Sequence, residues 1–236
     1  MAVFIILLIS DSLAKNPPFM GMEDLVKRKE IMTEMMEEYS IDNSIKISYT
    51  DELGIFTTAS KNLKDKEITV KIPGKSIMSA FDEFPFKELI IDVLSEIPET
   101  ANSLIPNRND FYISTMLLTA QLLVNINWDP DKLISKFPQY TNVPLYKQDW
   151  KLWQDYLDTL PSRQNLDHPN QWEKEDLDFF HKIALTRLGY RNIPDFYKKL
   201  REVLKEKMTD ESEYLLSEVF LSQEQYIWAY NIVNTR

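Results

Sequence analysis

The sequence predicts an α+β protein in which helices predominate and strands are confined to a short stretch near the N-terminus. Its 236 residues are 44% hydrophobic and 12% aromatic but include only 4 glycines, too few for a turn-rich barrel or sandwich. Apolar and polar residues alternate only between residues 45 and 73, whereas from about Ser79 onward apolar residues recur at helical spacing. A small sheet followed by a large helical part is therefore expected.

An apolar run at residues 2–9 raises the question of a secretory signal peptide, because the small residues Ser12 and Ala14 follow it. The run lacks the basic segment that precedes such a signal, and it is far shorter than the roughly 20 residues that span a bilayer. We therefore expect a cytoplasmic protein, which could also enter the nucleus. A secreted protein cleaved after Ala14 is the alternative.

Residues 1–39 are predicted to contain a helix and residues 40–78 a small β unit. Within residues 22–39, a stripe of methionines shares one helical face with Tyr39, a pattern typical of core packing or of a docking surface. In the β unit, apolar alternation predicts three strands separated by two polar turns. The alternating positions are Ile45, Ile47 and Tyr49, then Ile55 to Thr58, then Ile68, Val70 and Ile72. We expect these strands to form a three-strand meander that ends at Pro73.

Residues 79–236 show almost only helical periodicity. The predicted helices cover residues 86–97, 111–126, 149–160, 175–188, 194–208, 211–220 and 225–236. The last of them starts at a capping box formed by Ser222 and Gln225, but no stop signal follows it. We therefore expect this helix either to fray or to belong to a domain that continues past Arg236.

Charge and residue inventory exclude several classes of function. A formal net charge of −10 argues against a broad electrostatic grip on nucleic acid or anionic lipid. The chain has no cysteine and only two histidines, so disulfides, thiolate sites and His-based zinc cages are excluded, and we expect no metal. Both His168 and His181 lie in contexts typical of structural or surface residues. The expected partners are proteins or small molecules, with no nucleic acid and no membrane.

Two local motifs are weak evidence of a ligand site. Gly74-Lys75-Ser76 follows a strand, as in a phosphate-binding loop, but that motif requires a glycine where Thr69 stands. The basic run at residues 198–207 could contact an acidic protein or a phosphate group, yet glutamates interrupt it. A solvated helix face with i,i+4 ion pairs is the favoured interpretation of the basic run.

Several segments that are weak signals singly occur in an informative order. These are Leu-Gly-Ile-Phe-Thr-Thr at residues 53–58, a polar turn, Glu67, Ile72-Pro73, Trp153, residues 156–162 with Leu160-Pro161-Ser162, an acidic segment at residues 171–177, Trp228-Ala229 and Thr235-Arg236. This order resembles the SET-domain methyltransferases, and within them the branch that holds the Rubisco large-subunit lysine methyltransferases and the actin-histidine methyltransferase. The resemblance covers roughly residues 45–236.

The resemblance implies an S-adenosylmethionine-dependent protein N-methyltransferase that modifies a lysine or histidine side chain of a protein such as actin, without a metal. Gly54 and Glu67 would line the cofactor pocket, and Thr235 with Arg236 would meet the cofactor from the other side. These residue types suit that role, because glycine lets backbone approach a ligand, a carboxylate accepts from an ammonium group and arginine pairs with a carboxylate. The chain departs from the family pattern at Glu52, where a glycine is usual, and at Thr69, where close relatives have an aromatic residue.

The same resemblance implies that residues 40–236 are a partial SET domain, with residues 79–236 forming the helical insertion and returning helix. The family's Asn-His pair, the tyrosine of its methyl-transfer channel and its C-terminal substrate-binding domain would all follow Arg236. We therefore expect this chain to be incomplete and inactive by itself. The alternative is a non-catalytic helical protein-interaction module or a truncated product. The sequence does not indicate an oligomeric state.

Overall fold

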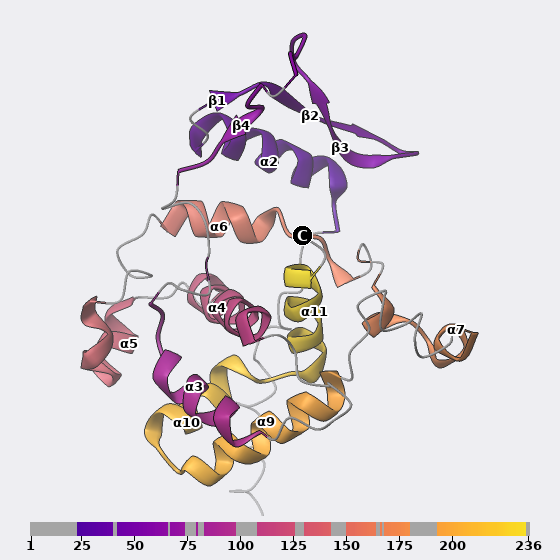
Figure 1. Cartoon of the computed structure of the whole chain (residues 1–236). Helices are drawn as coiled ribbons and strands as arrows, with labels where there is room; N and C mark the ends of the chain where they lie inside the picture. Colours follow the sequence, from indigo (N-terminus) through magenta and orange to yellow (C-terminus); the bar gives the residue numbers. More distant parts are fainter. Residues whose placement is uncertain are drawn as a thin grey trace, which may run out of the picture.

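The computed structural model is predominantly helical with two small, two-stranded antiparallel sheets, which agrees with the predicted α+β class (Figure 1). It describes residues 23–39, 42–65, 67–73, 79, 83–97, 108–125, 130–142, 150–163, 166, 168–179 and 193–234. The α-helices are α2 (Leu25–Tyr39), α3 (Lys87–Glu96), α4 (Arg108–Asn125), α5 (Pro130–Lys136), α6 (Trp150–Asp158), α7 (Lys174–Phe179), α9 (Ile193–Lys207), α10 (Asp210–Tyr214) and α11 (Gln223–Asn234). The shorter helical segments are η2 (Pro138–Asn142), η5 (Pro169–Gln171) and the π-helix η6 (Leu215–Val219), and the strands are β1 (Asp42–Asn43), β2 (Ile45–Thr50), β3 (Gly54–Ala59) and β4 (Val70–Lys71).

Most predicted helices are confirmed, with ends that differ by a few residues, as is usual for helix boundaries. The exception is the segment 211–220, which is not one α-helix but α10 followed by the wider turn of η6. Phe220 N–H donates to the Leu215 carbonyl at 2.7 Å, a bond five residues long that defines the π-helical turn. The predicted helix 175–188 is described only as far as Phe179.

The strands do not form the predicted meander. β2 and β3 make an antiparallel hairpin, but β4 pairs with β1 and not with β3. Ser44 joins the two pairings, because its N–H donates to the Thr69 carbonyl at 2.7 Å and its own carbonyl accepts from Ser60 N–H at 3.0 Å. In an antiparallel ladder, a hydrogen-bonded residue directs its N–H and its carbonyl to the same side of the strand. The segments before and after residues 61–68 therefore lie along the same edge of the strand 42–50.

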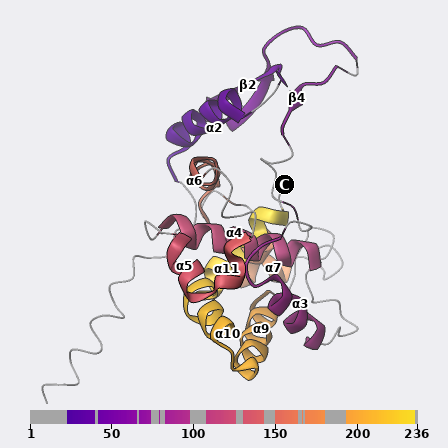
Figure 2. The same cartoon turned by 90° about the vertical axis from the view of Figure 1, so that its left-hand side faces the viewer.

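A loop separates these two segments. Continuing the hairpin register would place residue 61 opposite Asn43, where Val70 is found instead, so the register shifts by nine positions. Thr69 still bonds Ser44, so the residues that leave the ladder are 61–68. We call this part of the chain the 61–68 loop; Figure 2 shows it standing away from the strands. The third strand is present as β4, but its partner was mispredicted, because alternation of apolar residues reports which face is buried and not which strand lies beside it.

The β unit lies at one end of the molecule, with α2 against it and α6 between α2 and the remaining helices (Figure 1). Contacts of α2 with β2, β3 and α6, and of α6 with α4, connect the two regions. At this junction Arg28 Nε donates to the Thr159 carbonyl at 2.6 Å. The hydrogen bond reaches a carbonyl just past the end of α6, where helix carbonyls lack partners of their own.

The core lies in the helical body, which we define as α3, α4, α5, η2, α9, α10, η6 and α11. One aromatic cluster surrounds Tyr226, with ring centroids of its neighbours 5.6 to 6.2 Å away. These neighbours are Phe111, Phe196, Tyr197 and Phe220. A second cluster surrounds Phe86, which is 1% exposed and packs on Phe137, Tyr140 and Tyr214. Glu211 closes this cluster by accepting a hydrogen bond from the Tyr140 hydroxyl at 2.7 Å.

Candidate cofactor site

Gly54 begins β3 directly after a three-residue turn, and its φ of 65° lies in the left-handed region. Thr50 pairs with Gly54 across the hairpin, and the Thr50 hydroxyl accepts from Leu53 N–H at 3.1 Å. A side chain is disfavoured at this φ, which explains a glycine after a turn of this length. A Cβ added at Gly54 would meet no heavy atom of the described chain within 4 Å. Gly54 therefore adopts the conformation that the turn requires and leaves its backbone accessible to a ligand.

Glu67 lies in the 61–68 loop, and both of its carboxylate oxygens are bonded inside that loop. Oε1 is 2.7 Å from Lys61 Nζ, and Oε2 accepts from the Lys64 backbone N–H at 3.0 Å. The Lys61 ammonium, and next the Lys64 N–H, hold the pKa of the Glu67 carboxyl below its ordinary value. Glu67 is therefore an anion at neutral pH that already pairs with a primary ammonium group.

Gly54 and Glu67 are separated along β3. Gly54 is the first residue of this six-residue strand, whereas Glu67 follows Ser60, the residue after its last. An antiparallel strand of this length spans about 20 Å. Since the hydrogen bonds and ion pair of Glu67 all lie within its own loop, the structure does not bring the two predicted residues into contact.

The returning helix α11 is anchored to the segment that follows α6. Trp228 is fully buried, and its Nε1–H donates to the Pro161 carbonyl at 2.9 Å, across 67 residues of sequence. A buried indole N–H needs an acceptor, and a carbonyl outside the helices is free to serve. Leu160, also fully buried, belongs to the same core. Two segments that the sequence analysis selected separately are thus joined by one directional bond.

A buried polar contact lies one helical turn further along α11. The Asn231 Oδ1 accepts from Asn170 Nδ2 at 3.0 Å, and Asn170 N–H donates to His168 Nδ1 at 3.2 Å. His168 caps η5, so its role is structural, as predicted; His181 lies outside the described residues. The sequence analysis missed Asn170 and Asn231. The available signal was a polar residue three positions after Trp228 on a buried helix face.

The direction of α11 is the same in both views: the helix runs toward α6 and the strands, and Asn234 ends it on that side of the helical body (Figures 1 and 2). Thr235 and Arg236, the predicted residues of the second cofactor wall, lie outside the described residues. Their predicted roles therefore remain predictions. What the structure adds is the orientation of the helix that precedes them.

The described residues contain neither a cluster of metal-ligating side chains nor a helix that could span a membrane. No group of three or more His, Cys, Asp or Glu side chains there could hold a metal ion. None of the helices described is long and apolar enough to cross a membrane. The chemical groups that distinguish this part of the molecule are therefore the open backbone at Gly54 and the anionic carboxylate of Glu67.

No protein-family model matches the chain, and no curated protein matches it significantly. The chemistry of the site must therefore be derived from its own residues. These supply an open glycine backbone, a carboxylate that accepts an ammonium group, and a tryptophan-anchored helix that runs toward the β unit.

Proposed function

We propose that this chain forms the cofactor-binding part of an S-adenosylmethionine-dependent protein N-methyltransferase of the SET class, with a lysine or histidine side chain of a protein such as actin as substrate. The hydrogen bond between Trp228 Nε1 and the Pro161 carbonyl carries the proposal. It links the Leu160-Pro161-Ser162 segment to the Trp228-Ala229 segment, and both belong to the resemblance. An accidental similarity of separate motifs gives no reason for such a contact.

Two residue types of the β unit suit the proposed cofactor, and because Gly54 and Glu67 lie apart along β3 they would contact different parts of it. The cofactor's amino-acid end carries an ammonium and a carboxylate, and the ammonium of Lys61 on Glu67 is a stand-in for the first of these. Glu67 would accept the cofactor's ammonium in exchange for Lys61. Gly54 would allow its backbone to approach the cofactor, since no heavy atom of the described residues fills the space beside its Cα. Arg236 would pair with the carboxylate.

The proposed reaction needs orientation more than acid–base chemistry from this chain. When bound, S-adenosylmethionine supplies an electrophilic methyl group on a sulfonium, which a neutral side-chain nitrogen of the substrate accepts by in-line displacement. Residues that hold the cofactor in place make its reaction with the substrate nitrogen effectively intramolecular. In this proposal the protein acts in the cytoplasm on a protein partner and uses no metal.

Calorimetric titration of the chain with S-adenosylmethionine tests the proposal. We expect saturable binding, weakened about tenfold in Glu67→Gln because one charge-assisted bond to the ammonium is lost. Glu206→Gln is the matched control, because Glu206 is an exposed glutamate on α9, far from the β unit in sequence and in Figure 1. Absence of binding up to millimolar cofactor, or an equal loss in both variants, would contradict the proposal.

A further inference from the structure

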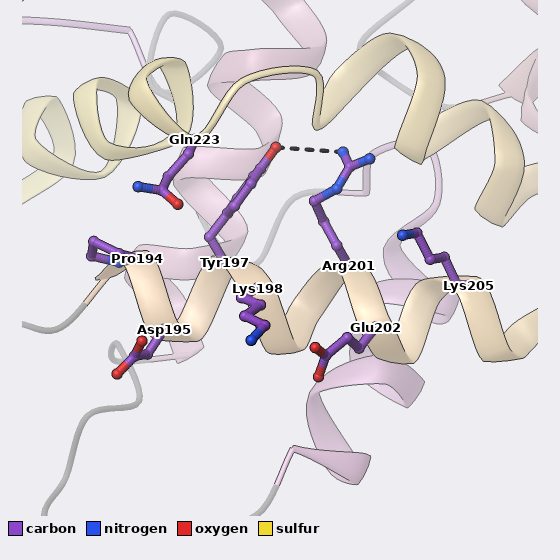
Figure 3. A pocket seen from close by; sticks show the side chains of 8 residues that line it. All are labelled: Pro194, Asp195, Tyr197, Lys198, Arg201, Glu202, Lys205 and Gln223. Atoms are coloured by element: carbon purple, nitrogen blue, oxygen red, sulfur yellow. Dashed lines mark hydrogen bonds between the residues drawn. The ribbon is translucent and has the colours of Figure 1, made fainter.

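A groove of about 410 Å³ runs along α9 beside the start of α11 (Figure 3). Its lining residues are Pro194, Asp195, Tyr197, Lys198, Arg201, Glu202, Lys205 and Gln223. The volume lies in the range of sites for small ligands and short segments. The groove belongs to the helical body, so it is separate from the candidate cofactor site on the β unit.

Arg201 forms the inner wall of this groove and is held rigidly. Its Nη1 donates to the Phe220 carbonyl, to the Leu216 carbonyl at 3.3 Å and to the Tyr197 hydroxyl at 3.4 Å, and its guanidinium lies 5.7 Å from the Tyr197 ring. All of these groups are uncharged. Only Nη1 is used in the described contacts, so the other guanidinium N–H groups remain as donors. The groove therefore has a fixed positive charge that no described carboxylate neutralises.

Lys198 and Lys205 add two further cations. Both are exposed, and within the described part of the chain neither makes an ion pair. At about 100° per residue the two lysines lie within about 20° of one another on α9, and at 1.5 Å per residue they are about 10 Å apart along its axis. They form a basic row next to Arg201.

Asp195 and Glu202 form a second row on the same helix, parallel to the lysine row and about 60° further round. Figure 3 shows both carboxylates on the side of α9 away from Gln223. With two acidic and three basic side chains, the lining has a small positive charge on a protein whose net charge is −10. A broad polyanion such as nucleic acid or an anionic membrane would meet this acidic row and the acidic protein as a whole, so it is disfavoured.

We propose that this groove binds a short acidic peptide segment of a partner protein in extended conformation. Side chains on one face of an extended peptide recur every ~6.6 Å, close to the ~6 Å axial separation of Arg201 and Lys205. Acidic residues at alternate positions of the peptide therefore match the spacing of Arg201 and Lys205. The Tyr197 ring and Pro194 offer apolar surface to the residues between them, and Gln223 offers hydrogen bonds to the peptide backbone.

The test is fluorescence anisotropy of the whole chain with a labelled heptapeptide that carries glutamate at alternate positions. We expect saturable binding that weakens as salt rises from 50 to 300 mM, because the contacts are exposed ion pairs. The double variant Lys198→Gln/Lys205→Gln is expected to weaken binding roughly five- to tenfold. Arg201 is not substituted, because it also bonds the Leu216 carbonyl within η6 and the Phe220 carbonyl just after it.

The matched control is Lys199→Gln/Lys46→Gln, which removes the same charge from two exposed lysines outside the groove. We expect it to change the affinity by less than twofold. Equal losses in both double variants would overturn the proposal, because binding would then reflect overall charge. No saturable binding, or at least tenfold preference for a phosphoserine version of the peptide, would also overturn it, the latter by assigning the groove to phosphate groups.

Discussion

The helical body and the β unit differ in how much of each is buried. In the helical body, fully buried aromatic side chains such as Trp228 and Tyr226 pack into continuous clusters. In residues 23–73, by contrast, Ile47 is the one buried apolar side chain among those described, at 6% exposure. Leu53, Ile68 and Ile72 are each more than half exposed. Burial of apolar surface is the main favourable term in folding, so the two regions should differ strongly in stability.

This contrast in burial indicates that the helical body is the rigid part of the molecule and that the β unit opens at a lower free-energy cost. A two-stranded hairpin is marginal unless its apolar face is covered, and here α2 supplies that cover and α6 supplies the link to the core. Two of the proposed cofactor residues, Gly54 and Glu67, lie on the less stable region, whereas the groove on α9 lies on the more stable one. Three substitutions, one in each region and one at the junction, test this comparison.

The largest expected effect is at Trp228. Trp228→Ala should lower the free energy of unfolding of the helical body by about 4 kcal/mol, because it opens a large cavity and removes the partner of the Pro161 carbonyl. Chemical denaturation followed by far-UV circular dichroism measures the change. Phe179→Ala is the control, since Phe179 is 84% exposed, and it should change stability by less than about 0.5 kcal/mol. A comparable loss in both variants would mean that the packing of α11 does not dominate stability.

A smaller and local effect is expected at Ile47. Ile47→Ala should lower the free energy of unfolding by about 2 kcal/mol. This is the low end for a buried isoleucine, because few other buried side chains surround Ile47. Hydrogen exchange should accelerate in residues 45–59 and stay unchanged in α4 and α11. Ile68→Ala, at a 54% exposed position of the same unit, is the control and should have little effect. Equal acceleration in α4 would show that the two regions unfold as one.

The smallest effect is expected at the junction, where Asp158 ends α6. Burial raises the pKa of the Asp158 carboxyl above its ordinary value, against the opposing pull of the Lys27 ammonium. The charged form is thus disfavoured in the folded protein, and an acid at a helix C-terminus also meets the negative end of the dipole. This penalty is complete above the folded-state pKa and is relieved as the pH falls through it toward the unfolded value near about 4.

Asp158→Asn should therefore raise stability at pH 7, by less than about 1 kcal/mol because the carboxyl is partly exposed and solvent screens it. The gain should fade as the pH approaches about 4. Thermal unfolding at a series of pH values measures it, with Asp178→Asn on the exposed face of α7 as the comparison. A loss of stability at pH 7 would show that attraction to Lys27 outweighs burial.

Sequence patterns predicted most of the helices, because the residues that form one helix are close together in the sequence. The helical periodicity of residues 194–208 corresponds to α9, whose Leu200 and Leu204 are buried while Lys199 and Glu206 are exposed. The pairing of β4 was not predictable, because it depends on two backbone bonds of Ser44 that form only when the strand 42–50 meets both segments. The π-helical turn at Leu215 likewise involves Arg201, 14 residues earlier, which bonds the carbonyls of Leu216 and Phe220.

Part of the candidate site was predictable, because it too depends on neighbouring residues in the sequence. The glycine at residue 54 follows a short turn, and its positive φ is a local requirement. The pairing of Glu67 with Lys61 depends on how a polar loop folds back on itself, for which the sequence offers no periodicity. The groove on α9 was recognisable only as a mixed basic run, because its wall includes Gln223 from a distant helix.

The 61–68 loop has a consequence for protein engineering. Because the pairings on either side of it are held independently, by β2 with β3 and by β1 with β4, the length of the loop does not set the register of either. Lengthening a loop costs little, since closure entropy grows only with the logarithm of its length. An epitope or a small fluorescent domain inserted between Asn62 and Leu63 should therefore be accommodated without shifting a strand. Such an insertion, a few residues from Glu67, would report on the cofactor binding that is proposed for this residue.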